Sequence, residues 1–344
     1  MTTIQLAFDA QRDTALRLRQ STLAERKAKI LKLRDAMLKY QEEIVQAGWA
    51  DFRKPAAEVD LTEVLPVVAE ANDAMRNLKA WMKPQGVWPS RMMFGTKGYM
   101  QYEPKGRCLI VSPWNYPVNL SLGPLVSAIA AGNTAIIKPS EMTPHASAII
   151  SKIVREVFDP SEVTVIEGEA PVAQALLELP FDHIFFTGST RVGKIVMAAA
   201  AKHLASVTLE LGGKSPVIVD NGADIEKIAA DLAGAKQFNG GQACISPDYV
   251  FIKEDQKTRL VEGFKATVAQ NLYDENGQIK KDSIAQIVNE ANFNRVKALF
   301  DDAVAQGATV AVGGKCLLNE CGGTQMQQYY RQQRMVDSGD TFDF

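Results

Sequence analysis

The spacing of hydrophobic positions changes along this chain. Up to about residue 95, apolar residues recur at intervals of three and four, as in amphipathic helices. A capping box formed by Thr22 and Glu25 predicts the start of one helix. A second helix is predicted from Ala56 to Met82, with Pro66 either kinking it or marking a restart. These helices carry no recognisable chemistry, so we interpret them as packing elements.

Beyond this part, Gly98 to Pro104 alternates in polarity and predicts a strand that serves as an edge or an arm. Short apolar strands and helices then alternate strictly, which predicts a doubly wound parallel α/β sheet with ligands at the carboxyl ends of its strands. The predicted strands are Cys108–Val111, Thr134–Ile137, Val163–Ile166, His183–Phe186 and Val207–Leu209, with helices near Asn119–Ala131, His145–Phe158, Pro171–Leu177 and Val192–Lys202.

A second α/β unit is predicted after Leu211. Its expected elements are a strand Pro216–Val219, a helix Asp224–Phe238, a strand Tyr249–Ile252, helices near Gln256–Asn271 and Ile284–Gln306, and a last strand Thr309–Val312. The glutamine-rich sequence that follows has no apolar period, so we expect no regular structure there.

Composition narrows the class of protein. The 344 residues are 46% hydrophobic and 23% charged, which predicts a globular protein of two or three domains. A net charge of −2 without a basic stripe argues against nucleic-acid binding. Charged residues interrupt the first twenty positions, so we expect no signal peptide and a cytoplasmic location. Residues 114–137 are uncharged, but their prolines, glycines and asparagines favour a buried helix between strands over a membrane span.

The four cysteines lack the paired spacing of a zinc site and the three histidines form no ligand pattern, so no metal site is predicted. Cys316 and Cys321 could pair under oxidising conditions, but nothing else in the sequence indicates such conditions. A reducing cytoplasm with Cys244 as a free thiol is the simplest interpretation.

Cys244 follows two glycines and precedes a Pro-Asp break in the stretch Gln237–Tyr249. An isolated cysteine is more often a small buried hydrophobe, but a free thiol is also a strong nucleophile that can attack a carbonyl. Asn115, held between two prolines, is a suitable donor to the resulting oxyanion. Glu210, at a strand end, could activate water in a dry site, although an exposed or salt-bridged glutamate is the more common case.

A dinucleotide could bind where the strand ending at Phe186 runs through Gly188 and Ser189 into a helix, because a helix start offers N–H groups to a pyrophosphate. The full glycine fingerprint is absent, and a plain tight turn explains the segment about as well. Lys138 and Glu141, after another strand, could bind ribose hydroxyls or lie in a solvated loop.

Together these stretches resemble the aldehyde dehydrogenase superfamily over roughly the first 315 residues. The motifs, in the family's order, are Pro-Trp-Asn115-Tyr-Pro, Lys138-Pro-Ser-Glu141, Phe-Thr-Gly188-Ser189-Thr-x-x-Gly193, Leu-Glu210-Leu-Gly-Gly-Lys and Gly-Gln-x-Cys244. The continuation Cys-Ile-Ser-Pro-Asp-Tyr and the absence of an amino-terminal extension look most like the class-3 branch, which acts on fatty and aromatic aldehydes.

The resemblance implies a role for each matching residue. Cys244 would form a thiohemiacetal and then a thioester, Asn115 with the Cys244 N–H would form the oxyanion hole, and Glu210 would activate the hydrolytic water. Tyr116 would line the aldehyde tunnel. The implied NAD-binding positions are Trp114, Lys138, Glu141, Gly168, Gly188, Ser189, Val192, Gly193 and Leu211. Lys138 and Glu141 would hold the adenosine ribose, Ser189 the pyrophosphate, and Gly168 with Val192 would flank the adenine. The charge of Glu141 favours NAD, although class-3 relatives often accept NADP.

The resemblance also implies a domain plan. Residues 1–95 would form helices that pack on the NAD-binding domain, 96–104 an oligomerisation arm, 105–210 the dinucleotide-binding domain, 211–315 an incomplete α/β catalytic domain, and 316–344 an irregular tail. The family's Glu-x-Phe-Gly-Pro segment and its carboxyl-terminal interface strand are absent from the sequence. We therefore expect weak or absent turnover with residual NAD binding, and a homodimer only by family resemblance.

The sequence leaves three alternatives open. One is a coenzyme-A-acylating relative, which Glu210 argues against. Another is an inactive fragment that still binds NAD. The third is a cofactor-independent cysteine hydrolase, for which His183 and His203 are the only plausible general bases.

Overall fold

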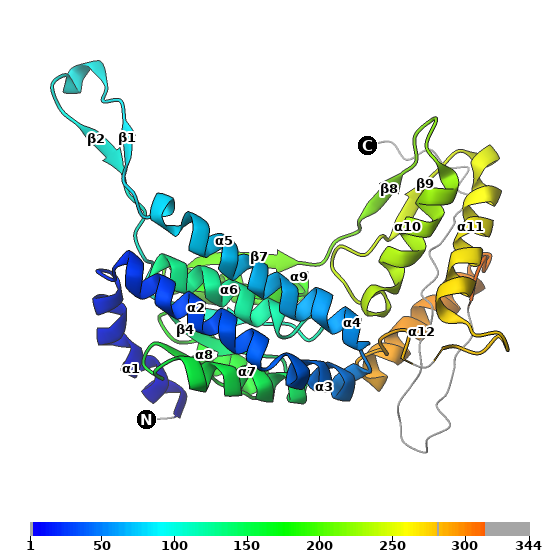
Figure 1. Ribbon diagram of the computed structural model, residues 1–344, viewed down its shortest axis with the longest axis horizontal. Coiled ribbons are helices and arrows are strands. Elements are labelled where there is room, and N and C mark those ends of the chain that lie inside the picture. The colour runs from blue at the N-terminus through cyan, green and yellow to red at the C-terminus, as the bar shows by residue number, and fades with distance from the viewer. Residues whose placement is uncertain (1–2, 281, 314–344) are drawn as a thin grey trace. The chain divides into compact units, whose positions relative to one another are not determined.

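The computed structural model, described over residues 3–280 and 282–313, contains a sheet of five parallel strands (Figure 1). The strands are β3 (Arg107–Val111), β4 (Thr134–Lys138), β5 (Val163–Val165), β6 (His183–Gly188) and β7 (Ser206–Leu211). Their spatial order is β5-β4-β3-β6-β7. The first strand of this sheet, β3, is central. The chain adds β4 and β5 on one side of β3 and then β6 and β7 on the other, which confirms the prediction of a doubly wound parallel sheet.

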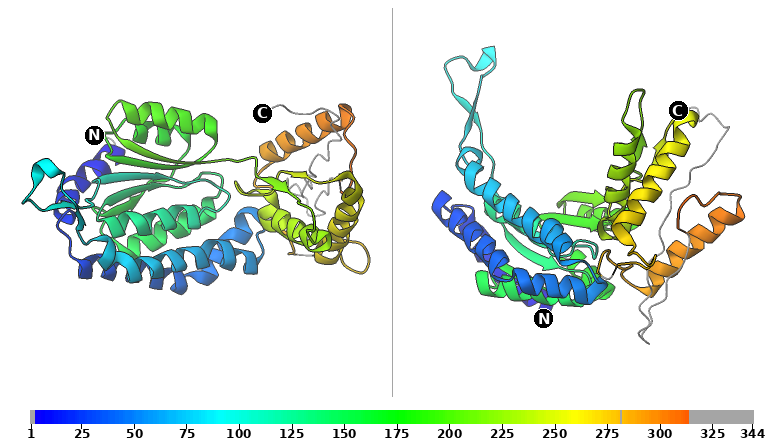
Figure 2. Two further views of the ribbon diagram at one scale, coloured as in Figure 1. Left: turned by 90° about the horizontal axis from the view of Figure 1, so that it is seen from above. Right: turned by 45° about the vertical axis from the view of Figure 1, so that its right-hand side comes forward.

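Alternate residues of the central strands face two separate cores. Ile110 and Ile137 pack with helices α2 (Leu23–Lys39), α5 (Leu65–Trp81), α6 (Asn119–Ala131) and α7 (Pro144–Val157). Leu109 and Ile136 pack with α1 (Thr3–Leu18), α8 (Ala170–Leu177) and α9 (Thr190–Ala201). The left view of Figure 2 shows helices on both faces of this sheet. Both faces are therefore buried, which explains why the strands read as continuous apolar runs.

Local signals set the ends of the first helices. Thr22 and Glu25 form the predicted capping box, with the Glu25 N–H donating to the Thr22 hydroxyl at 3.2 Å and the Thr22 N–H to the Glu25 carboxylate at 2.6 Å. The predicted second helix is divided into α4 (Ala56–Val59), a π-helical turn (Asp60–Val64) and α5, whose first turn contains Pro66. The backbone stays right-handed helical through Val59, Val64 and Leu65, so the chain enters α5 without the break that a restart would require.

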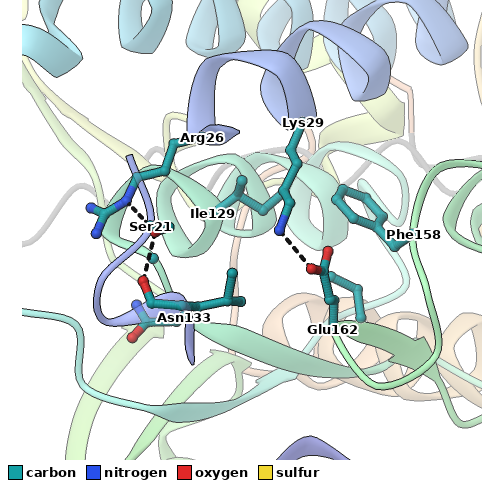
Figure 3. Close-up of a pocket in the computed structure, with 10 residues that line it drawn as sticks. Ser21, Arg26, Lys29, Ile129, Asn133, Phe158 and Glu162 are labelled. Carbon is teal, nitrogen blue, oxygen red and sulfur yellow. Dashed lines mark hydrogen bonds and ion pairs between the residues drawn. The ribbon is translucent and has the colours of Figure 1, made fainter. Parts of the chain in front are cut away.

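A small pocket of about 10 Å³ lies at the carboxyl end of α6 (Figure 3). Arg26 donates hydrogen bonds to the Ser21 hydroxyl at 2.8 Å and to the Ala130 carbonyl at 3.0 Å, and Lys29 forms an ion pair with Glu162 at 2.7 Å. A cation at this position satisfies the last carbonyls of the helix and complements its dipole. The pocket has room for about one water molecule, so we interpret it as structural.

An antiparallel hairpin of β1 (Gln85–Val87) and β2 (Gly98–Met100) projects from the end of α5 (Figure 1). The strand predicted from Gly98 to Pro104 ends at Met100, so its carboxyl-terminal half was wrong, and β1 was not predicted. A strand needs a partner strand to pair with, and β1, the partner of β2, is only three residues long.

The chain divides into two units. The first contains the described residues up to Ala47 and Val59–Leu211, and the second contains Gly48–Glu58 and the described residues from Gly212 onward. Helix α3 (Gln41–Phe52) spans the boundary between Ala47 and Gly48. In the second unit, the parallel strands β8 (Pro216–Ile218) and β9 (Tyr249–Phe251) pack with α10 (Ile225–Gln237) and α11 (Glu254–Leu272), and α12 (Glu290–Ala305) follows.

Two predicted elements of the second unit differ from the structure. The helix predicted from Ile284 begins only at Glu290, because the preceding backbone bonds elsewhere: Gln286 N–H donates to the Phe52 carbonyl at 2.7 Å. The strand predicted at 309–312 is absent, since β-branched residues form a strand only where a neighbouring strand pairs with them. The tail predicted at 316–344 lies outside the described residues.

The uncharged stretch at residues 114–137 forms a loop, α6 and most of β4. This confirms the prediction of a buried helix between strands. Among the described residues, none of the helices has the length and apolar character needed to cross a membrane.

Candidate active site

The predicted cofactor-binding residues of the first unit gather at the carboxyl edge of the parallel sheet. Lys138, Gly188 and Leu211 are the last residues of β4, β6 and β7. Trp114 and Gly168 lie in the loops that follow β3 and β5. Strand order reverses between β3 and β6, and ligands of doubly wound sheets bind outside the carboxyl ends of the strands at this point.

The turn from β6 leads directly into the start of α9. Ser189 is the N-cap of α9, and its hydroxyl accepts a hydrogen bond from the Val192 N–H at 3.3 Å. Because a hydroxyl also carries a donor hydrogen, Ser189 remains able to donate to a phosphate oxygen. The exposed first turn of α9 adds backbone N–H groups and the positive end of the helix dipole.

Two glycines of this segment are closely packed against neighbouring side chains. A Cβ on Gly188 would lie 2.5 Å from the Phe186 ring, and a Cβ on Gly193 would lie 2.9 Å from Leu211 Cδ2. Gly193 is buried, so α9 packs closely on β6 and β7. Glycines in a dinucleotide-binding turn commonly serve this helix–strand packing.

Lys138 and Glu141 form an ion pair, with the Lys138 Nζ 2.7 Å from the Glu141 carboxylate. Lys138 is only 4% exposed, so it does not lie in a solvated loop. Burial by itself would raise the pKa of Glu141, but the hydrogen bond from Lys138, a backbone hydrogen bond and the charge of Lys138 together outweigh burial, and the pKa lies below its ordinary value. The pair thus presents a charged donor and a charged acceptor at the end of β4.

Gly168, after β5, has a φ of +145°, which disfavours any residue with a side chain. A Cβ there would lie 2.5 Å from the Val172 Cγ2, on the first turn of α8. Val192, its predicted partner on either side of the adenine, lies on the first turn of α9 and is half-buried. Gly168 and Val192 therefore lie at the starts of two helices that follow sheet strands.

The loop that carries Trp114, Asn115 and Tyr116 connects β3 to α6, and all three side chains are half-buried. The Leu120 N–H donates to the Tyr116 carbonyl at 2.9 Å. At the end of the loop, the Val118 N–H donates to the Glu63 carboxylate at 3.1 Å. Sequence reasoning missed Glu63, which carries no local motif and is brought to this loop only by the packing of the π-helical turn.

Glu210 lies on β7, an edge strand, opposite Thr187 of β6. Its side chain is exposed, so the dry surroundings expected for a water-activating carboxylate are not present in the structure as described. Within the described residues no ion pair holds its carboxylate. The salt-bridged interpretation of Glu210 is therefore not favoured, and the carboxylate is available to water.

In the second unit, Cys244 lies on an irregular loop after α10. The loop begins with three consecutive left-handed residues, Asn239, Gly240 and Gly241, at φ values of 50°, 60° and 76°. Asn239 is fully buried, and its N–H donates to the Glu58 carboxylate at 2.5 Å. Gly240 and Gly241 thus form part of the left-handed turn that leads to Cys244.

The part of the loop that follows Cys244 is also held in place. Lys236 donates to the Pro247 carbonyl at 2.7 Å, and Lys214 pairs with Asp248 at 2.7 Å. A Cβ on Gly213 would lie 3.3 Å from the Cys244 carbonyl oxygen, so the backbone before β8 passes close to the cysteine. These contacts fix the loop while leaving the Cys244 side chain exposed.

The two described cysteines differ in chemistry. Cys244 is exposed and unbridged. Cys108, on β3, is buried, and burial raises its pKa to about 12, so its thiol stays protonated. Cys244 is therefore the thiol available as a nucleophile within the described residues, while Cys316 and Cys321 lie outside them.

The two histidines considered as bases for a cysteine hydrolase make other contacts. His183 bonds with the Ser206 hydroxyl at 2.8 Å and the Thr208 hydroxyl at 3.3 Å. His203 Nε2 lies 3.2 Å from the Glu178 carbonyl oxygen. Among the described residues there is no group of three or more His, Cys, Asp or Glu side chains with the geometry of a metal site.

A doubly wound sheet with charged and helix-start groups at its carboxyl edge is the architecture of a dinucleotide-binding α/β protein. The family model "Aldehyde dehydrogenase family" matches residues 2–330, further along the chain than the limit near 315 expected from the motifs. The chain belongs to the aldehyde dehydrogenase family.

Individual relatives agree with this placement. The chain is 47% identical over 311 residues to the "Putative aldehyde dehydrogenase AldX" of Bacillus subtilis, covering 90% of this chain and 70% of AldX. It is 40% identical over 283 residues to mouse "Aldehyde dehydrogenase family 3 member B1", covering 82% of this chain and 58% of that protein. The resemblance to the class-3 branch is thereby confirmed.

Solved structures show the same fold. The substrate-bound state of Staphylococcus aureus AldH matches with a TM-score of 0.85 and 38% identity over 92% of this chain and 68% of that chain. An NAD⁺ complex of an aldehyde dehydrogenase from Bacillus cereus matches with a TM-score of 0.84 and 28% identity over 94% of this chain and 66% of that chain. The chain thus spans between 58% and 70% of the length of these four proteins.

Proposed function

We propose that this protein oxidises an aldehyde to the carboxylic acid with NAD as the hydride acceptor, through a covalent intermediate on Cys244. The observation that carries the proposal is the gathering of Lys138, Glu141 and the Ser189 helix start at the carboxyl edge of the sheet. The same chain belongs to the aldehyde dehydrogenase family and has an exposed cysteine, Cys244, on a loop that hydrogen bonds hold in place.

The residues present fit a dinucleotide. The first turn of α9 with Ser189 would hold the pyrophosphate, and the pair Lys138–Glu141 would hold the adenosine ribose. Gly168, just before α8, and Val192, on the first turn of α9, would flank the adenine. NAD, when bound, supplies the hydride acceptor.

The chain's own residues would carry the remaining steps. The Cys244 thiolate adds to the aldehyde carbon, a C–S bond forms, and the oxygen becomes an oxyanion that accepts hydrogen bonds from the Asn115 amide and the Cys244 N–H. Loss of hydride from that carbon leaves a thioester. Glu210 then takes a proton from water, which attacks the thioester and releases the acid and the thiolate.

Charge and environment support finer proposals. Glu141 would repel a 2′-phosphate, so we expect NAD to be preferred over NADP. Membership of the class-3 branch favours medium- or long-chain aliphatic or aromatic aldehydes, with Tyr116 beside the substrate. A free Cys244 thiol requires reducing surroundings, which is why we propose a cytoplasmic location.

Trapping of the intermediate tests the proposed function. The protein is mixed with NAD and an aldehyde, quenched in acid, and its intact mass and peptides are measured. An acyl group on Cys244 is expected in the parent and in a Cys108→Ala control. Acylation that persists in Cys244→Ala, or an adduct that forms equally without NAD, would contradict the mechanism.

The hairpin supports a second proposal, association with another copy of this chain. Its tip exposes Trp88 at 100%, Met92 at 97% and Phe94 at 95%. Exposed apolar clusters of this kind mark interaction surfaces, and the short β1–β2 ribbon has an edge open to further pairing. Sedimentation should detect dimers that a Trp88→Ser, Phe94→Ser variant weakens and that a Leu204→Ser control retains. A monomeric parent at micromolar concentration would contradict this proposal.

A further inference from the structure

One helical stretch, Ala56–Val64, carries two carboxylates that bond to backbone N–H groups of distant loops. The first of these is Glu63, which is 3% exposed. Its Oε2 accepts hydrogen bonds from the Val118 N–H at 3.1 Å and the Asn119 N–H at 2.9 Å. No side chain at the N-cap of α6 bonds to its first turn, so Glu63 takes the place of a local cap. A buried carboxylate is well placed here, because a helix start stabilises negative charge.

A second bond strengthens this attachment. The Asn119 side-chain amide donates to the Thr62 carbonyl at 3.0 Å. The π-helical turn therefore contacts the start of α6 through both backbone and side chain. Val118 follows Asn115 by three positions, so these bonds fix the point at which the loop that carries the oxyanion-hole amide enters its helix.

The other carboxylate, Glu58, holds the loop of the second unit. Its Oε1 accepts the Asn239 N–H at 2.5 Å. Asn239 has a φ of 50°, a backbone conformation that residues with a Cβ adopt at an energetic cost. Gln242 adds support, since its side-chain amide donates to the Asn239 carbonyl at 2.8 Å. The turn that Glu58 holds leads directly to Cys244.

From these contacts we propose that Glu58 and Glu63 are positioning residues for the proposed reaction: Glu63 orients the loop that carries Asn115, and Glu58 orients the loop that carries Cys244. This inference rests on the proposed function and deepens it. Neither carboxylate touches substrate. The π-helical turn, Asp60–Val64, contains Glu63 and begins two residues after Glu58, and such turns occur frequently at functional sites.

Glu63→Gln tests the first half, because glutamine keeps a carbonyl acceptor but loses the charge. Its matched control is Glu70→Gln, since Glu70 lies on α5 and also bonds to α6, through the Ser127 hydroxyl at 3.2 Å, at an exposed site. Hydrogen exchange is measured at the Val118 and Asn119 amides, with kcat and the KM for NAD. We expect about tenfold faster exchange and a kcat lower by about 10- to 100-fold in Glu63→Gln, with the KM for NAD unchanged.

Glu63→Ala removes the acceptor completely and should give a larger loss of kcat than Glu63→Gln. If the alanine variant does not fold, the glutamine variant alone decides. A purely structural cap would lower the melting temperature and leave the kcat of the folded protein unchanged. An unchanged kcat in Glu63→Gln, or exchange at Val118 and Asn119 equal to that of Glu70→Gln, would therefore overturn this half.

Glu58→Gln tests the second half against Glu226→Gln, whose carboxylate is exposed and pairs with Arg259 at 2.7 Å. Exchange at the Asn239 amide should be about tenfold faster in Glu58→Gln only. The rate at which iodoacetamide alkylates Cys244 should also change in Glu58→Gln and not in the control. Equal exchange and equal alkylation in the two variants would overturn this half.

The readouts separate this inference from the proposed function. If the parent oxidises no aldehyde, the proposed function fails, and kcat cannot be compared between the variants and their controls. Amide exchange at the two loops and alkylation of Cys244 still decide whether Glu58 and Glu63 hold them. If the parent is active and the glutamine variants match their controls, the positioning role fails while the proposed function stands.

Discussion

The ammonium group of Lys138 lies 2.7 Å from the carboxylate of Glu141 at the end of β4. The lysine side chain is 5% exposed and the glutamate side chain 38% exposed, so the pair offers its acidic member to a ligand from solvent. A ribose with two free hydroxyls can accept from the lysine and donate to the glutamate. A ribose with a 2′-phosphate would place negative charge against Glu141.

This relationship predicts a change in cofactor preference. Glu141→Gln should weaken NAD binding by about tenfold, because a charged acceptor is lost, and should tighten NADP binding because the repulsion is removed. Titration calorimetry with both dinucleotides measures the two effects. Glu167→Gln, which neutralises an exposed charge after β5, is the control and should change neither affinity. An unchanged preference in Glu141→Gln would show that the carboxylate does not meet the ribose.

A second prediction concerns pH and His183, whose pKa is lowered by burial and by the charge of Lys105. In the unfolded chain the imidazole protonates near its ordinary value of 6.5, whereas in the folded chain it protonates only at lower pH. The unfolded state therefore binds more protons in this window. The stability contributed by neutral His183 is present above pH 6.5 and is lost as pH falls through the lower folded pKa.

Melting temperatures between pH 8 and pH 5 check this sign. The parent should lose stability below pH 6.5 more steeply than His183→Gln, which cannot take up the proton. His203→Gln, at an exposed position, should follow the parent. Parallel curves for the parent and His183→Gln would contradict the assignment.

Glu210→Gln should separate acylation from hydrolysis. If Glu210 activates the water that attacks the thioester, the variant still forms one equivalent of NADH rapidly and then turns over at a rate lower by about 100-fold or more. Stopped-flow absorbance measures the burst and the steady rate. A variant without a burst, or with the parent's steady rate, would remove Glu210 from this role.

The helix behind the Asn115 loop also provides a stability prediction. Leu122 of α6 is fully buried in the core with α2 and α5, so Leu122→Ala should lower the free energy of unfolding by about 2–5 kcal/mol. Ile195→Ala on α9 removes a side chain that is 52% exposed and should cost much less. Urea denaturation compares the two variants. Equal losses would mean that α6 is not the core element described.

The sequence predicted the elements whose signals are local. The bounds of α6 agree with the structure, because apolar residues at helical spacing end at Gly132, which adopts a left-handed φ of 87°. The central strands also agree, since their apolar runs are buried on both faces. The errors occurred where the extent of a strand depends on pairing with another strand. The strand predicted from Gly98 to Pro104 was too long, and the strand predicted at 309–312 does not form.

The site shows the same division. The edge position of Lys138, Gly188 and Leu211 follows from the predicted alternation of strands and helices, because carboxyl ends of parallel strands share one edge. Glu58 and Glu63 could not be predicted, since their partners lie far away in sequence and each bond depends on tertiary packing. A carboxylate in a helical stretch gives no local sign that it caps another element.

The most direct test of the central claim is NADH formation. The purified chain is incubated with NAD and benzaldehyde or a medium-chain aldehyde, and absorbance at the NADH band is followed for the parent and for Cys244→Ala. The account predicts NADH from the parent, even if slowly, and none from Cys244→Ala. No NADH from a parent that binds NAD, or equal NADH from both proteins, would contradict it.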